Sequence, residues 1–184
     1  AFDVTTTYME EESTANNVYQ IKPNMKIIVI LRNPVDRAYS QYHLNLREKA
    51  EKRSFEDAME ENMNELNKES YERYEIKPKF SVEENNYLKK GLYAQQLRHW
   101  LNIFPMESML ILSTEEFESN QQVIYNKIFE FLNISQFEVK NTEKMEKGSY
   151  PQMKSETRSL LLDYFRSYNK ELFRLIDKKF DWEK

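Results

Sequence analysis

Three side chains able to bind an anion follow one short apolar segment of the sequence. Arg32 comes directly after the run Ile27–Leu31, and Arg37 and Ser40 follow shortly afterwards. A guanidinium group can bind a phosphate through two parallel hydrogen bonds, and a hydroxyl group adds a further donor. These residues are candidates for a phosphate site, although an arginine after a strand also commonly forms a surface ion pair and a helical serine often bonds its own backbone.

The sequence around these residues predicts a strand that leads into a helix. Residues 27–31 form a continuous apolar run rich in β-branched side chains, which favours a strand covered on both faces of an α/β sheet. Pro34 suits the first turn of a helix over residues 34–52, with Asn33 as its N-cap. Ligands of open α/β sheets gather at the carboxyl ends of strands, so we expect the site where this strand ends.

Residues 31–40, LRNPVDRAYS, closely resemble the 3′-phosphate-binding segment of sulfotransferases that use 3′-phosphoadenosine 5′-phosphosulfate (PAPS). The resemblance implies that Arg32 and Ser40 hold the 3′-phosphate of the nucleotide. It also implies an α/β fold of the P-loop NTPase-like sulfotransferase type, with a central parallel sheet flanked by helices. PAPS is then the co-substrate, and no metal is required.

Further segments resemble the same family in the same order. Residues 87–105 are similar to the helical segment that precedes the next strand, and residues 108–113, SMLILS, to that strand. A helix ending near residue 134 follows. Most of these side chains are expected in the core.

Residues 147–151, KGSYP, are similar to the C-terminal loop of glycosaminoglycan-type sulfotransferases, such as those acting on heparan sulfate. In that family a lysine-glycine loop closes over the cofactor, which places Lys147, Gly148, Ser149 and Tyr150 among the cofactor-binding residues. The residue types agree, because glycine allows close backbone approach and lysine brings a mobile positive charge. A plain exposed turn has a similar composition.

The candidate catalytic residue is Asp3. Residues 2–8, FDVTTTY, precede strand 27–31 by about the spacing at which related enzymes carry a catalytic glutamate, and Val4 stands where those relatives have lysine. A carboxylate near an acceptor hydroxyl or amine can act as general base during attack on sulfur. A surface aspartate near a chain end is the alternative.

The family's loop for the 5′-phosphosulfate has no match in the sequence. That loop is glycine-rich and cradles phosphate groups with backbone N–H groups, whereas Gly91 and Gly148, the two glycines, lie in no such arrangement. We therefore expect residues 1–184 to be the C-terminal two-thirds of a single sulfotransferase domain. The alternatives are a phosphate loop supplied by another segment and a domain that has lost catalysis.

The remaining elements are predicted more coarsely. Ser54 and Asp57 are expected to open a second helix, and residues 68–86 are expected to form a loop or lid. A C-terminal helix should begin near Ser155 and pack on the sheet, and Trp182 should seal the domain.

The composition limits which classes of protein the chain can belong to. The chain has 184 residues, of which 40% are hydrophobic, enough for one domain with a substantial core. A net charge of -4 argues against a general nucleic-acid binder. His43 and His99 form no metal-ligand pattern, so no metal site is expected.

Cysteine is absent, which excludes disulfides and thiolate metal sites and is compatible with a reducing compartment. No signal peptide or membrane span is visible in the sequence. A cytoplasmic location is therefore favoured, with the Golgi lumen as the alternative if an N-terminal anchor has been lost. The sequence makes no prediction of oligomeric state.

The expected function is transfer of a sulfuryl group from PAPS to a hydroxyl or amine of a carbohydrate or small-molecule acceptor, with carbohydrate favoured by the C-terminal resemblance. Transfer should proceed in line, through positioning and positive electrostatics. The alternatives are a catalytically inactive nucleotide-binding or scaffold domain of the same fold and a P-loop kinase-like phosphotransferase, which would need a magnesium-binding acidic residue.

Overall fold

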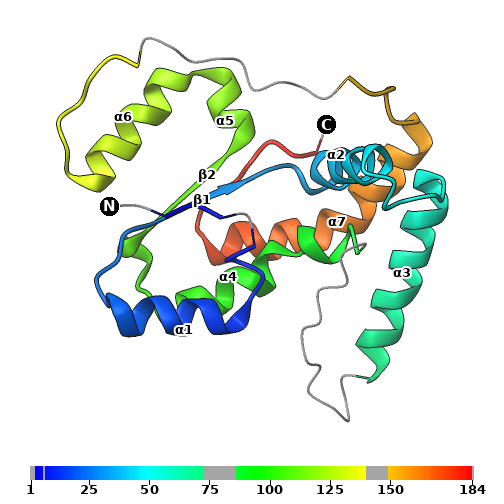
Figure 1. Ribbon diagram of the computed structural model, residues 1–184, viewed down its shortest axis with the longest axis horizontal. Helices are drawn as coiled ribbons and strands as arrows, with labels where there is room; N and C mark the ends of the chain where they lie inside the picture. Colours follow the sequence, from blue (N-terminus) through cyan, green and yellow to red (C-terminus); the bar gives the residue numbers. More distant parts are fainter. Residues whose placement is uncertain (1–2, 6, 73–85, 140–148, 184) are drawn as a thin grey trace.

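The computed structural model describes residues 3–5, 7–72, 86–139 and 149–183, and its elements are drawn in Figure 1. In chain order these elements are α1 (Glu12–Ile21), β1 (Ile27–Leu31), α2 (Pro34–Arg47), α3 (Phe55–Glu72), the 3₁₀ turn η1 (Lys89–Gly91), α4 (Tyr93–Leu101), the 3₁₀ turn η2 (Met106–Ser108), β2 (Met109–Ser113), α5 (Thr114–Ser119), α6 (Gln121–Leu132) and α7 (Ser155–Leu175).

The two strands pair in parallel, as expected for this fold class. Ile27 lies opposite Met109, and Leu31 lies opposite Ser113. Both strands therefore end at the same edge of the sheet, where the site was predicted. Helices α1, α4 and α7 lie on one side of the sheet, and α5 and α6 lie on the other (Figure 1).

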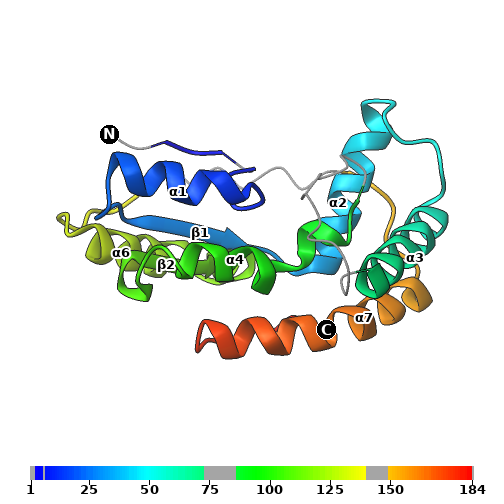
Figure 2. The same cartoon turned by 90° about the horizontal axis from the view of Figure 1, so that it is seen from below.

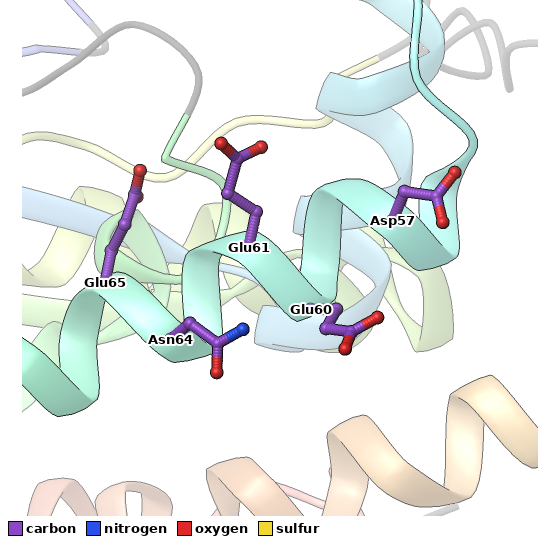
Figure 3. Close-up of a pocket in the computed structure, with 5 residues that line it drawn as sticks. All are labelled: Asp57, Glu60, Glu61, Asn64 and Glu65. Atoms are coloured by element: carbon purple, nitrogen blue, oxygen red, sulfur yellow. The ribbon is translucent and has the colours of Figure 1, made fainter.

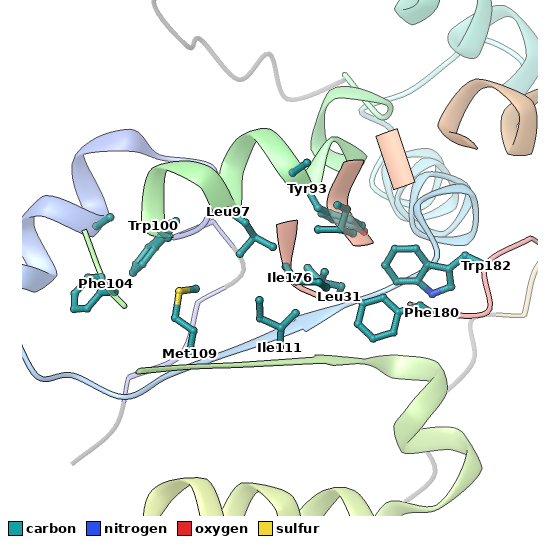
Figure 4. Packing of buried hydrophobic residues seen from close by; sticks show 13 residues of the cluster. Leu31, Tyr93, Leu97, Trp100, Phe104, Met109, Ile111, Ile176, Phe180 and Trp182 are labelled. Atoms are coloured by element: carbon teal, nitrogen blue, oxygen red, sulfur yellow. The ribbon is translucent and has the colours of Figure 1, made fainter. Parts of the chain in front are cut away.

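One hydrophobic cluster joins the sheet to α1, α4 and the C-terminal segment. The side chains of Leu31, Met109 and Ile111 pack toward Leu97 of α4, as Figure 4 shows. Trp182 belongs to the same cluster and is 1% exposed, which confirms the prediction that it seals the domain. The core thus reaches the carboxyl edge of the sheet.

A second cluster joins α2 and α3 to the first half of α7. It contains Val35 and Ala38 of α2, Phe55 and Met59 of α3, and Phe165 of α7. Helix α7 begins at Ser155, as predicted, and passes beneath both α3 and the sheet (Figure 2). This long helix therefore fixes α2 relative to the two strands.

The exposure of β1 and the ends of two helices differ from the expectations. Strand β1 is not covered on both faces, because Ile30 is 53% exposed. Helix α2 ends at Arg47 rather than near residue 52, since Lys49 takes a left-handed backbone conformation with φ of 60°. Helix α3 opens as predicted, with the Asp57 N–H donating to Ser54 Oγ over 3.1 Å, but it continues to Glu72. The loop or lid expected over residues 68–86 is therefore helical up to Glu72, and residues 73–85 lie outside the described residues.

Candidate functional site

The junction of β1 and α2 is fixed by hydrogen bonds from three other parts of the chain. Asn33 caps α2, as predicted, by accepting from the Val35 N–H over 3.0 Å. The Asn33 N–H donates to Glu115 of α5 over 2.8 Å, and its side-chain amide donates to the Trp182 carbonyl over 3.4 Å. The Tyr93 hydroxyl of α4 donates to the Arg32 carbonyl over 2.9 Å. Burial raises the pKa of Tyr93 to about 12, so this phenol remains a donor at neutral pH.

Arg32 and Ser40 both present unused polar groups at this junction. Each residue is partly exposed, and neither side chain forms a hydrogen bond or ion pair with another described residue. Their backbones are held by β1 and α2, whereas the guanidinium and hydroxyl groups remain available to a ligand. The N-terminus of α2 adds a partial positive charge at the same edge.

Arg37 behaves differently from Arg32. Its Nη1 donates to Gln41 Oε1 over 2.7 Å, and its Nη2 donates to the Tyr87 carbonyl. Burial lowers the pKa of Arg37, and the nearby positive charge of Arg32 lowers it further. The sequence grouped Arg37 with the phosphate ligands, but both of its terminal nitrogens are used within the protein, one within α2 and one on the segment that precedes η1. Arg37 contributes positive charge to the site rather than a free guanidinium fork.

The loop that follows residue 148 is attached to α2 beside Ser40. The Tyr150 ring stacks on His43 with centroids 4.5 Å apart and planes at 3°, and it meets Tyr39 edge-on at 5.5 Å. The Tyr39 hydroxyl donates to the Pro151 carbonyl over 2.9 Å. Because Tyr39 and Ser40 are neighbours on α2, these contacts bring Ser149 and Tyr150 to the helix that carries Ser40.

The sequence did not predict that Tyr39 and His43 contact this loop. The two residues lie four apart on one helix, which puts them on the same face, and that spacing was the available signal. Burial lowers the pKa of His43, so the stacked imidazole is held in the neutral form more firmly than in water. Lys147 and Gly148, the other predicted residues of this loop, lie outside the described residues.

The other end of this loop is fixed where α7 begins. Arg158 of α7 donates to Asp36, in the first turn of α2, over 2.7 Å and 3.4 Å through its two terminal nitrogens. Thr157 donates to Glu56 of α3 over 2.9 Å. These bonds hold the start of α7 against the helix that carries Ser40.

Asp3 lies in an exposed segment at the N-terminal end of the chain. Its Oδ2 accepts a hydrogen bond of 2.6 Å from the Tyr8 hydroxyl, and its Oδ1 accepts from the Val4 N–H over 2.9 Å. The bond from Tyr8, together with the negative charge of Asp3, raises the pKa of that tyrosine. Within the described residues no hydrogen bond or ion pair joins Asp3 to Arg32 or Ser40, so the structure does not bring all the predicted site residues into contact.

A hollow on α3, shown in Figure 3, has a chemistry unlike that of the junction. Its volume is about 380 Å³, and it is lined by Asp57, Glu60, Glu61, Asn64 and Glu65. Four carboxylates repel a phosphate group, so this hollow is no candidate for a nucleotide. Across the described ranges, no group of three or more histidine or acidic side chains is arranged to hold a metal ion.

Two further findings bear on the sequence predictions. Gly91 packs against Pro34 and Phe165 rather than lining a phosphate loop, because a Cβ atom there would lie 2.9 Å from each of them. None of the helices in the described part of the chain is long and apolar enough to cross a lipid bilayer.

Several known proteins with similar sequences are named as sulfotransferases. Membrane-associated sulfotransferase kil1 of Dictyostelium discoideum is 23% identical over 98% of this chain and 53% of its own length. Human carbohydrate sulfotransferase 15 is 28% identical over 92% of this chain and 33% of its own length. Bovine bifunctional heparan sulfate N-deacetylase/N-sulfotransferase 2 is 26% identical over 96% of this chain and 22% of its own length. The chain thus spans about half or less of the length of these relatives.

A solved structure agrees with these sequence matches. The crystal structure of a sulfotransferase from Alicyclobacillus acidocaldarius superposes with a TM-score of 0.75 at 26% identity, over 98% of this chain and 66% of that protein. The sequence profile of the sulfotransferase domain matches residues 14–181. That match covers the β1–α2 junction, both strands and α7, and the chain belongs to the sulfotransferase family.

Proposed function

We propose that the protein transfers a sulfuryl group from PAPS to a hydroxyl or amine of a carbohydrate. The observation that carries the proposal is the pair of unengaged groups at the end of β1, the Arg32 guanidinium and the Ser40 hydroxyl. Relatives named as carbohydrate and heparan sulfate sulfotransferases support the acceptor class.

The nucleotide half of the site follows from these groups. Arg32 donates two parallel hydrogen bonds to the 3′-phosphate, and Ser40 donates one from the next helix. The N-terminus of α2 and the buried charge of Arg37 add positive potential. The loop with Lys147, Gly148, Ser149 and Tyr150 closes over the nucleotide, and the stacking of Tyr150 on His43 ties that loop to α2.

In the reaction the acceptor oxygen or nitrogen forms a bond to sulfur while the bond between sulfur and the bridging phosphate oxygen breaks. The leaving group is 3′-phosphoadenosine 5′-phosphate (PAP). Asp3 accepts the proton that the acceptor loses, and the Tyr8 hydroxyl orients its carboxylate through Oδ2. Positive charge from the site stabilises the negative charge that develops on the leaving phosphate.

Calorimetric titration of the full-length protein with PAP tests the nucleotide half of the proposal. Arg32→Ala should weaken PAP binding by about ten- to a hundredfold, because hydrogen bonds to charged groups contribute roughly 1.5–3 kcal/mol. Ser40→Ala should weaken it less. Arg98→Ala and Ser167→Ala are matched controls, because both residues are exposed on α4 and α7 and should leave the affinity unchanged.

A sulfation assay with PAPS and a panel of carbohydrate acceptors then tests the reaction. Transfer that depends on Arg32 supports the proposal. PAP binding without transfer to any acceptor would identify an inactive nucleotide-binding domain. Absence of PAP binding by the folded full-length protein would remove the donor assignment.

A further inference from the structure

We propose that His43 holds the segment 149–151 beside Ser40 only while its imidazole ring is neutral, so that nucleotide binding displaces a proton from His43. This inference rests on the proposed function, since it gives the C-terminal loop of the nucleotide site a positioning residue. His43 follows Ser40 by three residues on α2, and residues at that spacing are neighbours on a helix surface. A side chain that packs on His43 is therefore brought to the helix face that carries Ser40.

Three tyrosine rings contact the His43 imidazole. The Tyr150 ring stacks on it with centroids 4.5 Å apart and planes at 3°. Tyr39 and Tyr42, from the same helix as His43, meet it edge-on at 4.5 Å and 5.2 Å. The Tyr39 hydroxyl also donates to the Pro151 carbonyl over 2.9 Å. The segment is thus attached to α2 at two successive residues, and one of the two attachments is the imidazole stack.

The protonation state of His43 matters because of where its Nε2 atom lies. Nε2 is buried and has no hydrogen-bond partner among the described residues. A neutral imidazole can leave this nitrogen without a proton, whereas an imidazolium must carry an N–H group there. The free-energy cost of burying a charged N–H without an acceptor exceeds the attraction of a cation to neighbouring aromatic faces. The stacked arrangement therefore favours the neutral form, and burial accordingly lowers the pKa of His43.

The titratable groups in contact with His43 are phenols, those of Tyr39, Tyr42 and Tyr150. Burial raises the pKa values of Tyr39 and Tyr42, so both phenols are neutral below pH 7. The charges that act on these two phenols lie on α3 and in the turn before it, at Glu51, Arg53, Glu56 and Asp57. For the residues that the structure describes, burial alone accounts for the lowered pKa of His43.

The attached and detached states of the segment therefore differ in their affinity for a proton. With the segment detached, the His43 ring is open to water and its pKa returns toward the ordinary value of 6.5. With Tyr150 stacked on the ring, the pKa is lower, so attachment releases a proton and protonation opposes attachment. Because the nucleotide is proposed to bind with this loop held to α2, PAP affinity should fall as the pH decreases below 6.5.

Calorimetric titration of the full-length protein with PAP at pH 8 and pH 5.5 tests the inference. His43→Phe keeps a ring that can stack on Tyr150 but has no nitrogen to protonate. At pH 8 its PAP affinity should stay within about twofold of the wild type, whereas His43→Ala should lose about two- to tenfold with the stacking contact. Between pH 8 and pH 5.5 the wild type should lose about three- to tenfold more affinity than His43→Phe, because one group can contribute at most about tenfold one pH unit below its pKa.

The displaced proton can also be counted. Titrations at pH 6 in two buffers of different ionisation enthalpy give the number of protons released per PAP bound, and the wild type should release roughly half a proton more than His43→Phe. This difference excludes the protons of PAP itself, whose phosphate groups also titrate near pH 6. Equal proton release from the two proteins, or less release from the wild type, would overturn the inference.

His99→Phe is the matched control for the proton count. His99 lies on α4, and its Nε2 is likewise buried without a hydrogen-bond partner in the described part of the chain. Removing it should leave the proton release equal to that of the wild type. A decrease as large as that in His43→Phe would show that the proton does not come specifically from the ring stacked on Tyr150.

An NMR titration of the His43 ring needs neither turnover nor an acceptor. Its signal, assigned by its loss in His43→Phe, should give a pKa below 6.5 that falls further when PAP is bound. A pKa at or above 6.5 in the PAP complex would overturn the inference.

The two proposals fail in different ways. If the folded full-length protein does not bind PAP, the donor assignment is wrong and the inference falls with it. If PAP binds in a way that depends on Arg32, and His43→Phe shows the same pH dependence as the wild type, the proposed nucleotide site stands and the role of His43 is wrong.

Discussion

The β1–α2 junction and the Asp3 segment differ in how the chain holds them. At the junction, Asn33 is buried and bonded to α5 and the C-terminal segment, and Tyr93 of α4 bonds the Arg32 backbone. Among the described residues, Asp3 instead forms hydrogen bonds only within its own exposed segment. The half of the site that is proposed to bind the nucleotide has its backbone fixed to the core, whereas the half that is proposed to meet the acceptor is exposed.

This difference is useful for a transferase. A preformed anion site costs little to organise when the nucleotide binds, because its backbone is already fixed. A base on a lightly held segment can adjust to an acceptor that arrives from solvent. Changes at the junction should therefore affect stability and nucleotide affinity, and changes in the Asp3 segment should affect turnover alone.

The largest expected effect is on turnover. Asp3→Asn keeps the shape of the side chain and removes its basicity, so kcat should fall by about a hundred- to ten-thousandfold, the usual contribution of a general base. PAP affinity and thermal stability should not change, because Asp3 is exposed and, in the part of the chain that the structure describes, bonds only to Val4 and Tyr8. Steady-state kinetics with calorimetry on the same preparation would measure both. A variant with full kcat would remove Asp3 from the mechanism.

The junction could be predicted well from sequence because its signals are local. The apolar run of β1, the Asn33 cap and Pro34 lie within one short stretch, and each acts on its immediate neighbours. The capped start of α3 and the beginning of α7 at Ser155 were predicted for the same reason. Arg32 and Ser40 were singled out first by residue type and then by family resemblance, and their role stays a prediction.

The sequence could not predict contacts between residues that lie far apart along the chain. The internal bonds of Arg37 depend on Tyr87, fifty residues away along the chain. The stacking of Tyr150 on His43 likewise joins distant segments, and the exposure of Ile30 depends on which elements cover each face of β1. Pattern and propensity report a residue's local surroundings, so contacts of this kind emerge only once the chain is folded.

The second prediction concerns how tightly the junction is packed. Gly91→Ala places a methyl group 2.9 Å from the Pro34 Cβ and from the Phe165 ring, and overpacking of this kind typically costs about 1 to 3 kcal/mol. The loss should appear in urea unfolding, together with weaker PAP binding, because Pro34 begins the helix that carries Ser40. Ala94→Gly, in the buried part of α4, is a control for helix effects without added volume. An unchanged unfolding free energy for Gly91→Ala would show that the packing yields easily.

The smallest expected effect lies beyond the far end of α2, where Glu51 joins the turn after that helix to Tyr87. Glu51 is 6% exposed, and it accepts from the Arg53 guanidinium, from the Lys52 and Arg53 N–H groups and from the Tyr87 hydroxyl. The Arg53 bond is the main cause of the lowered pKa of Glu51, about 2, and these bonds together outweigh the opposing effect of burial. Because the folded state lowers the pKa, the carboxylate stabilises the fold above the ordinary value of 4.5.

That stabilisation should be lost as the pH falls from about 4.5 toward 2, the window between the unfolded and folded pKa values. With partial solvent screening at Arg53, we expect a loss of roughly 1 to 2 kcal/mol. Urea unfolding of the wild type and of Glu51→Gln at pH 7 and pH 3 would measure it, with the exposed Glu107→Gln as control. The gap between wild type and Glu51→Gln should narrow at pH 3, while PAP affinity at pH 7 stays close to that of the wild type. A gap that stays constant with pH would mean that the charge of Glu51 does not stabilise this end of α2, and that the tight bonding of the junction stops at the residues around Arg32.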